Sequence, residues 1–262
     1  MKNYKKTPLT DNPLRLPGQS IDKEIQRVID DEASPYILIS LMVIALTALE
    51  WWRWYTNIKL SPNIFTTIAV IVVTFSVYKI IKIKKKLNNL RLGKEGEIAV
   101  GQYLELFREK GFKVFHDIVG KKGEEFNIDH VLIGSKGIFT IETKTYSKPS
   151  KGKANVVFDG DKIFINGQES KSDIVSQAKA ESNWLTNKLK ALTGKTYKVK
   201  PVVVFPGWYT ENLAKKKANL WVLNPKGLLT FLSNAPNVLS REEVQCIANN
   251  LSRYIRETNI KP

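Results

Sequence analysis

Two acids and a lysine near the middle of the chain have the types and spacing to attack a phosphodiester bond. Glu142 and Lys144 are one residue apart in an apolar run that is typical of a β-strand. Residues two apart in a strand share a face and lie about 7 Å apart, at roughly 3.4 Å per residue. Asp129 lies in the preceding strand-like run. Carboxylates can hold a divalent ion that activates water, and an ammonium group can stabilise the transition state.

A four-residue turn, Gly134–Gly137, separates these two runs, so we expect them to pair as a hairpin. Asp129 then lies toward the same end of the pair as Glu142. Two carboxylates converging there would form a hard oxygen site suited to Mg²⁺ or Mn²⁺. The alternative is ordinary ion pairing of Lys144 with either carboxylate, because buried charges are costly unless they are partnered.

A third acid, Glu97, lies on the apolar face of the helix expected over residues 93–110. It shares that face with Val100, Gly101 and Leu104, at the i+3, i+4 and i+7 positions. An acid on the inward face of a helix needs a partner. Glu97 is therefore a candidate to lie beside the two strand-borne carboxylates.

The elements that must position these residues follow the order helix, strands, helix, strand, helix. The patterns predict strands at 113–118, 126–133, 138–145, 156–158, 162–165, 201–205 and 220–223, and helices at 173–192 and 240–256. This order predicts an α/β domain over residues 93–262, with a mixed central sheet flanked by helices. About 170 residues are enough to bury a core.

Three sequence blocks carry a family resemblance: Gly93 to Val100, Ile128 to Gly134 and Gly137 to Lys144. Their order and spacing resemble the nuclease-related domain (NERD) family, over roughly residues 90–210. That family is assigned to the PD-(D/E)xK superfamily, so the resemblance implies a restriction-endonuclease-like fold. Ile128 stands where the superfamily name has a proline, which many members lack.

The resemblance also implies roles for the candidate residues. Asp129 and Glu142 would hold Mg²⁺ or Mn²⁺, with the backbone carbonyl of Thr143 as a further ligand. Lys144 would orient the attacking water or stabilise the developing negative charge. Glu97 would act beside the site, through water or through the metal.

Gln177, on the helix expected over residues 173–192, matches a glutamine that related nucleases carry. It shares a helix face with Ile174, Ala178 and Glu181, so its side chain could reach inward. The alternative is an ordinary glutamine on the surface of a helix.

Two apolar runs, residues 35–52 and 60–78, precede this domain. As helices they would be about 27–29 Å long at roughly 1.5 Å per residue, which matches a bilayer core of about 30 Å. Neither run has the polar stripe of a surface helix. The seven residues between them predict a two-pass hairpin over residues 35–83, with aromatic residues at its turn.

Basic residues flank this hairpin on its two outer sides and predict its orientation. They are dense in the linker over residues 84–92 and just before it, and they recur in the N-terminal segment over residues 1–34. The positive-inside rule then places both termini in the cytoplasm and the chain in the cell membrane. The lysines next to the bilayer are interpreted as attracting anionic lipid, with a nucleic-acid contact as the alternative.

Composition limits the class of protein. The chain has 262 residues and a formal net charge of +16, which indicates an anionic partner such as nucleic acid or membrane lipid. A single cysteine excludes an intramolecular disulfide framework and a cysteine-based zinc cluster. The composition is not that of a collagen-like, low-complexity or globally disordered chain.

We therefore expect a membrane-anchored, Mg²⁺-dependent nuclease, with DNA favoured over RNA as the substrate and with a homodimer as a compatible assembly. One alternative is a catalytically silent module that holds nucleic acid at the membrane. Another is a membrane protein whose acids and lysine form only structural ion pairs, and whose basic region serves only lipid binding and topology.

Overall fold

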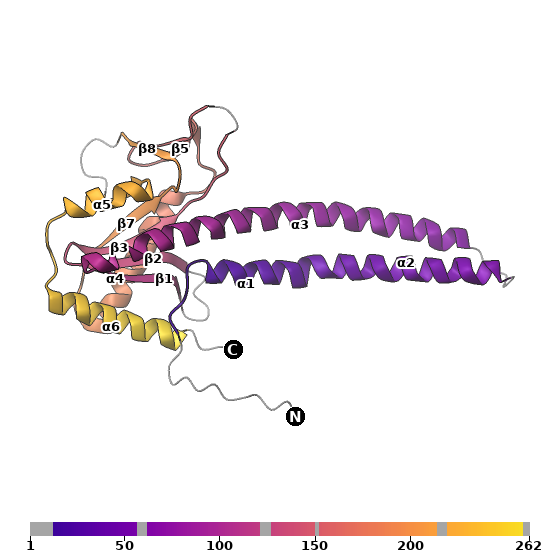
Figure 1. The fold of residues 1–262 in the computed structure, drawn as a ribbon, viewed down its shortest axis with the longest axis horizontal. Helices are drawn as coiled ribbons and strands as arrows, with labels where there is room; N and C mark the ends of the chain where they lie inside the picture. The colour runs from indigo at the N-terminus through magenta and orange to yellow at the C-terminus, as the bar shows by residue number, and fades with distance from the viewer. Residues whose placement is uncertain (1–12, 57–61, 121–126, 150–151, 214–218, 259–262) are drawn as a thin grey trace, which may run out of the picture. The chain divides into compact units, whose positions relative to one another are not determined.

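The structure is a computed structural model of the chain, and it describes residues 13–56, 62–120, 127–149, 152–213 and 219–258. The chain divides into two compact units. One unit holds the described residues up to Gln19 together with those from Gly93 onward, and the other spans Ser20–Leu92. Each unit is described separately below, with the element labels of Figure 1.

A five-stranded mixed sheet forms the centre of the first unit (Figure 1). The first three strands form an antiparallel meander, and the other two pair in parallel with it. In spatial order the strands are β1 (Lys113–Val119), β2 (Asn127–Gly134), β3 (Gly137–Thr143), β7 (Val199–Val204) and β9 (Trp221–Leu223). Strand β3 is central and buried along its whole length.

Helices cover both faces of this sheet. Helices α4 (Ile174–Thr193) and α6 (Arg241–Thr258) pack on one face through a core that includes Val131, Ile138 and Leu185. The C-terminal part of α3 (Pro62–Glu105) and helix α5 (Pro225–Ser233) pack on the other face. Each face of the sheet therefore buries apolar side chains, which is why the strands show nearly continuous apolar runs.

The strands of a smaller sheet lie between β3 and β9 in the chain, and this sheet adds a third apolar core beside the start of α4. Its four strands, in spatial order, are β6 (Gln168–Glu169), β5 (Ile163–Ile165), β4 (Asn155–Phe158) and β8 (Tyr209–Asn212). The sequence predicts the hairpin of β4 and β5. It does not predict β6 or β8, which are short, exposed edge strands without a strong apolar pattern.

The predicted fold class is confirmed: the unit is α/β, with mixed sheets flanked by helices. The expected pairing of β2 with β3 is also confirmed, because Gly134 pairs with Gly137 across the turn and His130 pairs with Ile141. The same register leaves Asp129 opposite Glu142, at one end of the hairpin.

The second unit is helical and contains both apolar runs. Its chain passes through α1 (Gln19–Arg27), a π-helical turn (Val28–Ala33) and α2 (Ser34–Tyr55) before it enters α3. Helices α2 and α3 lie side by side and antiparallel. The indole N–H of Trp51 donates to Thr66 Oγ1 at 3.0 Å, and Tyr36 packs edge-on against Phe75.

Both helices are long and apolar enough to cross a membrane, which is weak support for a spanning role. Large apolar side chains such as Leu38, Met42 and Ile71 are exposed along them, whereas a helix in the core of a soluble protein would bury such groups. The expected turn between the helices, Arg53–Lys59, lies partly outside the described residues.

The basic segment over residues 84–92, which the sequence predicts to be a linker, is helical. Helix α3 runs without interruption from Pro62 to Glu105, so no new helix begins at Gly93. The lysine-rich stretch continues the helix because lysine, leucine and isoleucine are compatible with helical structure, and each internal glycine costs only about 1 kcal/mol relative to alanine. Gly111, in the left-handed region with φ 84°, follows the short 3₁₀ turn (Arg108–Lys110) after this helix.

Gly96 of α3 allows the helix to approach the chain just after β3. A Cβ atom at this position would lie 1.7 Å from Thr145 Oγ1. We expect Gly96→Ala to lower the free energy of unfolding by about 1–3 kcal/mol, because the overlap forces the helix or Thr145 to move. Thermal unfolding of the full chain measures this effect.

Gly227→Ala is the matched control for this substitution. Gly227 lies in helix α5, and a Cβ atom there would have no neighbour within 4 Å. Alanine is the better helix former, so we expect no loss of stability, or a small gain of about 0.5–1 kcal/mol. Equal melting temperatures for the Gly96→Ala variant and the parent would contradict the close approach.

Candidate active site

An ammonium group and two carboxyl groups meet at the end of the β2–β3 hairpin. The Nζ atom of Lys144 lies 2.7 Å from Glu142 Oε1. The backbone N–H of Thr143 donates to Asp129 Oδ2 at 2.7 Å, so the two strands bring Asp129 beside the Glu142–Lys144 segment. Asp129 and Glu142 are buried, whereas the Lys144 side chain keeps 22% of its surface exposed. The lysine is therefore the member of the group that solvent and a substrate can reach.

Helix α4 supplies a glutamine that connects these groups. The side-chain amide of Gln177 donates from Nε2 to Glu142 Oε1 at 2.9 Å and to Glu181 Oε1 at 3.0 Å. Its Oε1 atom accepts a hydrogen bond from Lys144 Nζ at 2.9 Å. The side chain thus reaches the strand residues as the helical spacing predicts, and it is not an isolated surface glutamine.

Glu181 was not among the residues that the sequence singles out for the site. Its side chain is buried on α4, and burial and the Glu142 carboxylate, which it also hydrogen-bonds, raise its pKa to about 10. Glu181 is therefore a neutral acid at pH 7 and can share its proton with Glu142. The signal for it was present, because it lies one helical turn after Gln177 on the same face.

Glu97 approaches from the C-terminal part of α3. Burial, together with the carboxylates of Asp117 and Glu142, raises the pKa of Glu97 to about 7. A backbone hydrogen bond from Gly18 opposes this shift. Burial, with the charges of Glu142 and Glu97, likewise raises the pKa of Asp129 well above its usual range. The acids are therefore close enough to repel one another.

The single lysine does not balance this group of acids. Burial lowers the pKa of Lys144, but the Glu142 carboxylate, which attracts and hydrogen-bonds the ammonium group, raises the pKa above its usual value. Within the part of the chain that the structure describes, Glu97 Oε2 and Glu142 Oε2 are buried without a hydrogen-bond partner. Buried carboxylate oxygens without partners are costly, so the site has capacity for an additional cation.

These residues fit a divalent metal ion that takes two carboxylate ligands from the protein and most of its other ligands from elsewhere. No group of three or more His, Cys, Asp or Glu side chains in the described ranges converges closely enough to hold an ion alone. Mg²⁺ commonly uses one or two carboxylates together with water and substrate phosphates. Asp129 and Glu142 satisfy that requirement, and the carbonyl of Thr143 stays a predicted further ligand.

A buried ion pair lies beside the acids and involves the N-terminal segment. Arg15 Nε donates to Asp117 Oδ2 at 2.7 Å, and both side chains are almost fully buried. The pairs His116–His130 and Ile118–Ile128 leave Asp117 opposite Asp129, where the β1–β2 ladder is interrupted. Asp117 has φ 52°, a left-handed conformation that aspartate tolerates better than most residues.

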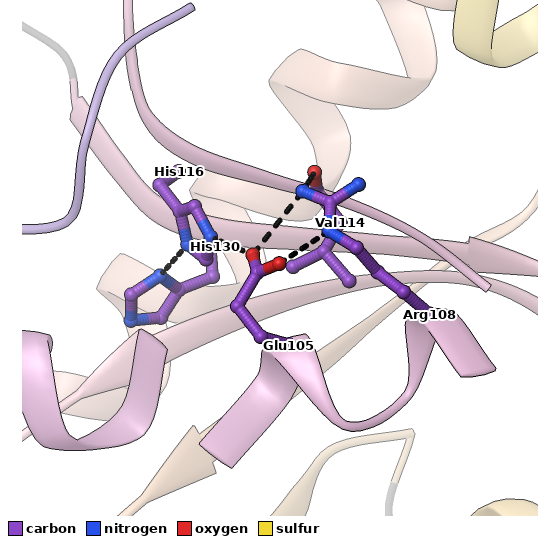
Figure 2. Close-up of polar contacts among 5 residues, drawn as sticks. All are labelled: Glu105, Arg108, Val114, His116 and His130. Atoms are coloured by element: carbon purple, nitrogen blue, oxygen red, sulfur yellow. Dashed lines mark hydrogen bonds and ion pairs between the residues drawn. The ribbon is translucent and has the colours of Figure 1, made fainter. Parts of the chain in front are cut away.

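Two histidines form a second polar chain with Glu105, as Figure 2 shows. The Nδ1 atoms of His116 and His130 lie 2.9 Å apart, and His116 Nε2 lies 2.8 Å from Glu105 Oε1, which also accepts a hydrogen bond from Arg108 Nη2 at 3.1 Å. Burial lowers the pKa of both histidines, most strongly for His130. Two neutral rings can share one hydrogen bond, and the Glu105 carboxylate then fixes His116 as its Nε2–H tautomer.

That tautomer makes His116 Nδ1 the acceptor and His130 Nδ1–H the donor of the shared hydrogen bond. His130 Nε2 is then an unprotonated nitrogen, buried without a hydrogen-bond partner in the described ranges. His130 is thus a core residue, as its position one residue from Asp129 on the opposite face predicts. The partners of His116 were not apparent from the sequence, because they come from α3 and β2.

The structure thus brings together the five predicted side chains Glu97, Asp129, Glu142, Lys144 and Gln177, and it places the Thr143 backbone between two of them. Glu181, which contacts Gln177, also belongs to this group, and the ion pair of Asp117 with Arg15 lies at its edge. The catalytic and metal-binding roles of all these residues stay predictions.

One of three comparisons with known proteins finds a family. Residues 92–206 match the family model of the nuclease-related domain, and a comparison with curated proteins finds no match. Among solved structures, the crystal structure of a Vibrio cholerae protein matches at 10% identity with a TM-score of 0.25, over 94% of this chain and 59% of that one. The chain thus spans under two thirds of that structure, and a likeness this weak supports no argument. The matched segment, residues 92–206, holds all six predicted site residues and is similar to the nuclease-related domain (NERD) family.

Proposed function

We propose that this chain is a membrane-anchored nuclease that hydrolyses nucleic-acid phosphodiester bonds with Mg²⁺ or Mn²⁺. One observation supports this most: within a nuclease-related domain, the Lys144 ammonium group contacts the Glu142 carboxylate beside Asp129, at the end of a central hairpin. Phosphodiester hydrolysis needs an activated water and a cation near the developing charge. This group of residues can supply both.

Each residue has a distinct task in this proposal. Asp129 and Glu142, with the Thr143 carbonyl, would hold the metal ion, which when bound supplies a water of lowered pKa and a polarised phosphoryl oxygen. The partly exposed ammonium group of Lys144 stabilises negative charge on the phosphate. Gln177 keeps Glu142 and Lys144 in place through its side-chain amide, whose Nε2 donates to Glu142 and whose Oε1 accepts from Lys144. Glu97, with a pKa of about 7, can accept or donate a proton next to them.

The test is cleavage by the full chain, in lipid nanodiscs, of fluorescent linear DNA, single-stranded DNA and RNA in Mg²⁺, Mn²⁺ or EDTA. We expect cleavage only with metal and a loss of at least about a hundredfold in Glu142→Gln, because the neutral amide keeps the size of the side chain but removes a metal ligand. Calorimetric titration of Mn²⁺ should show weaker binding to the variant than to the parent.

Glu169→Gln is the matched control, because Glu169 is an exposed acid whose ion-pair partner at 2.8 Å is Lys162 and not a residue of the hairpin end. This variant should cleave at the rate of the parent. If a folded Glu142→Gln variant cleaves as fast as the parent, the site assignment is wrong. If the parent binds DNA in EDTA but cleaves nothing in either metal, the chain is a catalytically silent binding module instead.

Nucleic acid is the partner that the nuclease-related domain suggests, and we propose DNA over RNA as the substrate. The net charge of +16 would favour such a polyanion and would make binding decrease steeply with salt.

Anionic lipid is the proposed partner of the basic residues that flank the spans, and a homodimer is the proposed assembly. Light scattering of the nanodisc-free, detergent-solubilised chain would report the number of copies.

The two apolar helices support a cell-membrane location, and we propose that both termini face the cytoplasm. Cys246 can report this orientation, because it is the single cysteine of the chain and is exposed on α6. In intact cells we expect a membrane-impermeant maleimide to leave Cys246 unmodified, and to modify it once the membrane is permeabilised. A Cys246→Ser chain is the control. Modification in intact cells would reverse the proposed orientation.

A further inference from the structure

A large pocket lies at the end of the central sheet opposite to the candidate active site. Its volume is about 910 Å³, within the range of small-molecule sites. It is lined by the starts of β3, β7 and β9 and by the segment that follows α5. Phe139 lines it and Lys144 does not, and the two are five residues apart, about 16 Å at roughly 3.3 Å per residue. The pocket is therefore separate from the candidate active site.

One wall of the pocket is aromatic. Trp221 stacks on Phe139 with ring centroids 5.5 Å apart and an interplanar angle of 23°. Phe231 meets Trp221 edge-on at 5.3 Å and is 40% exposed. An aromatic surface open to solvent is the kind of surface on which nucleobases stack, and each stacked base contributes about 1–3 kcal/mol.

The rim of the pocket is basic. Four lysines line it: Lys136, Lys195, Lys198 and Lys200. The ammonium group of Lys200 lies 4.0 Å from the centroid of the Trp221 ring, and burial and the neighbouring charge of Lys198 lower the pKa of Lys200. Charges of one sign held this close to an apolar surface favour an anionic ligand.

Two of these lysines are available to a ligand. Neither Lys195 nor Lys198 makes an ion pair or a side-chain hydrogen bond within the described ranges, whereas Lys136 donates to the carbonyl of Ala235 at 2.7 Å. The acid at the rim, Glu243, accepts the backbone N–H of Ser240 and so caps α6. The rim therefore presents more positive charge than its own residues neutralise.

Polar groups in the pocket lining distinguish between kinds of anion that also have an apolar part. Asn219, Asn234, Thr196 and Thr230 line the pocket. Amide and hydroxyl side chains can donate to and accept from the edge of a nucleobase, whereas an alkyl chain would leave them without partners. This lining favours a flat, polar-edged anion over a fatty acid.

We propose that this pocket binds a nucleotide, with its base against Trp221 and Phe231 and its phosphate on Lys195 and Lys198. The ligand is a free mononucleotide or the terminal nucleotide of a single strand, which share this chemistry. The site is independent of the proposed catalysis, because none of the acids at the hairpin end contributes to it.

The test is calorimetric titration of the full chain in nanodiscs, in EDTA, so that binding does not depend on the proposed metal site. We expect AMP to bind with a dissociation constant below about 1 mM, and at least about tenfold more tightly than adenosine or ribose 5-phosphate, each of which lacks one half of the ligand. A single-stranded tetra-adenylate identifies the source: tighter binding than AMP assigns the pocket to a strand, and weaker binding assigns it to a free nucleotide.

Substitutions connect the binding to the pocket. Lys195→Ala with Lys198→Ala should weaken AMP at least about tenfold, and Phe231→Ala should weaken it about fivefold to tenfold by removing one stacking surface. All three side chains are exposed, so the variants should keep the fold. Lys190→Ala, an exposed lysine of α4 outside the pocket, is the control and should leave AMP binding unchanged.

Three results would overturn the proposal. The first is no heat of binding for AMP or tetra-adenylate at millimolar concentration. The second is AMP binding that the double lysine variant and the Phe231 variant leave unchanged. The third is tighter binding of decanoate than of AMP, which would make the pocket a site for fatty acids.

Discussion

Lys144→Met should reduce nucleic-acid cleavage by the full chain at least about a hundredfold, because it removes the cation that lies closest to the proposed reaction centre. Methionine keeps the length of the side chain but loses the ammonium group that contacts Glu142 at 2.7 Å and Gln177 at 2.9 Å. Binding of uncleaved DNA should change much less, since it depends on many positive charges. The measurement is single-turnover cleavage in Mg²⁺ together with DNA binding in EDTA.

The control for Lys144→Met must also remove a paired lysine. Lys162→Met does so, because Lys162 pairs with Glu169 at 2.8 Å and both side chains are more than half exposed. This surface pair contributes little, about 0–1 kcal/mol, so cleavage and stability should match those of the parent. If a folded Lys144→Met variant cleaves at a rate within about twofold of that of the parent, Lys144 has no role in catalysis.

Arg15→Met should lower the free energy of unfolding of the nuclease-related unit by about 3–5 kcal/mol, because it leaves Asp117 buried and unpaired. Asp117 is 0% exposed, and its Oδ1 atom has no hydrogen-bond partner in the described ranges. Arg15 Nε, at 2.7 Å, neutralises it beside Glu97, whose pKa burial and the Asp117 charge already raise. For a domain of this size the loss corresponds to a melting temperature about 6–20 °C lower.

Two further variants show that the effect comes from the uncompensated charge. Arg15→Met combined with Asp117→Asn should recover much of the lost stability, because the neutral amide tolerates burial better than a carboxylate. Arg27→Met removes an exposed arginine that lies 3.8 Å from Glu24 and from Asp31, and it should cost less than about 1 kcal/mol. Equal melting temperatures for Arg15→Met and Arg27→Met would show that the buried ion pair contributes no more to stability than the exposed one.

These two expectations concern different parts of one electrostatic arrangement. Lys144 is partly exposed and can act on a substrate, whereas Arg15 is buried and can only balance charge. Their effects should therefore separate: Lys144→Met acts mainly on cleavage, and Arg15→Met acts mainly on stability. Measuring both quantities for both variants tests this division directly.

Local patterns predicted the core of the candidate site. The alternation of side chains in a strand places Glu142 and Lys144 on one face, and the short turn at Gly134–Gly137 requires the β2–β3 hairpin. Helical spacing likewise placed Gln177, which is exposed, where its side chain reaches Glu142 and Lys144. Each of these inferences uses residues that are close in sequence, where backbone geometry leaves few alternatives.

The sequence also contains signals for the start of helix α5 and for Glu181. Asn224 followed by Pro225 is a helix-start signal, and α5 begins there with the Asn224 side chain accepting the N–H of Lys226. Glu181 follows Gln177 by four residues and contacts it. For helix α3 the sequence signal is misleading. Its change from apolar to basic residues indicates that the helix ends, but the backbone stays helical from Pro62 to Glu105.

Residue types, strand alternation and the spacing of the three sequence blocks were enough to predict the α/β class and the resemblance to the nuclease-related family, and to choose the acids and the lysine. They were not enough for Arg15 with Asp117, which are 102 residues apart, or for His116 with Glu105 and His130. They also could not reveal the pocket beside Trp221. Those contacts join separate elements, and only the packing of the whole chain decides which buried charges meet and which surfaces stay open.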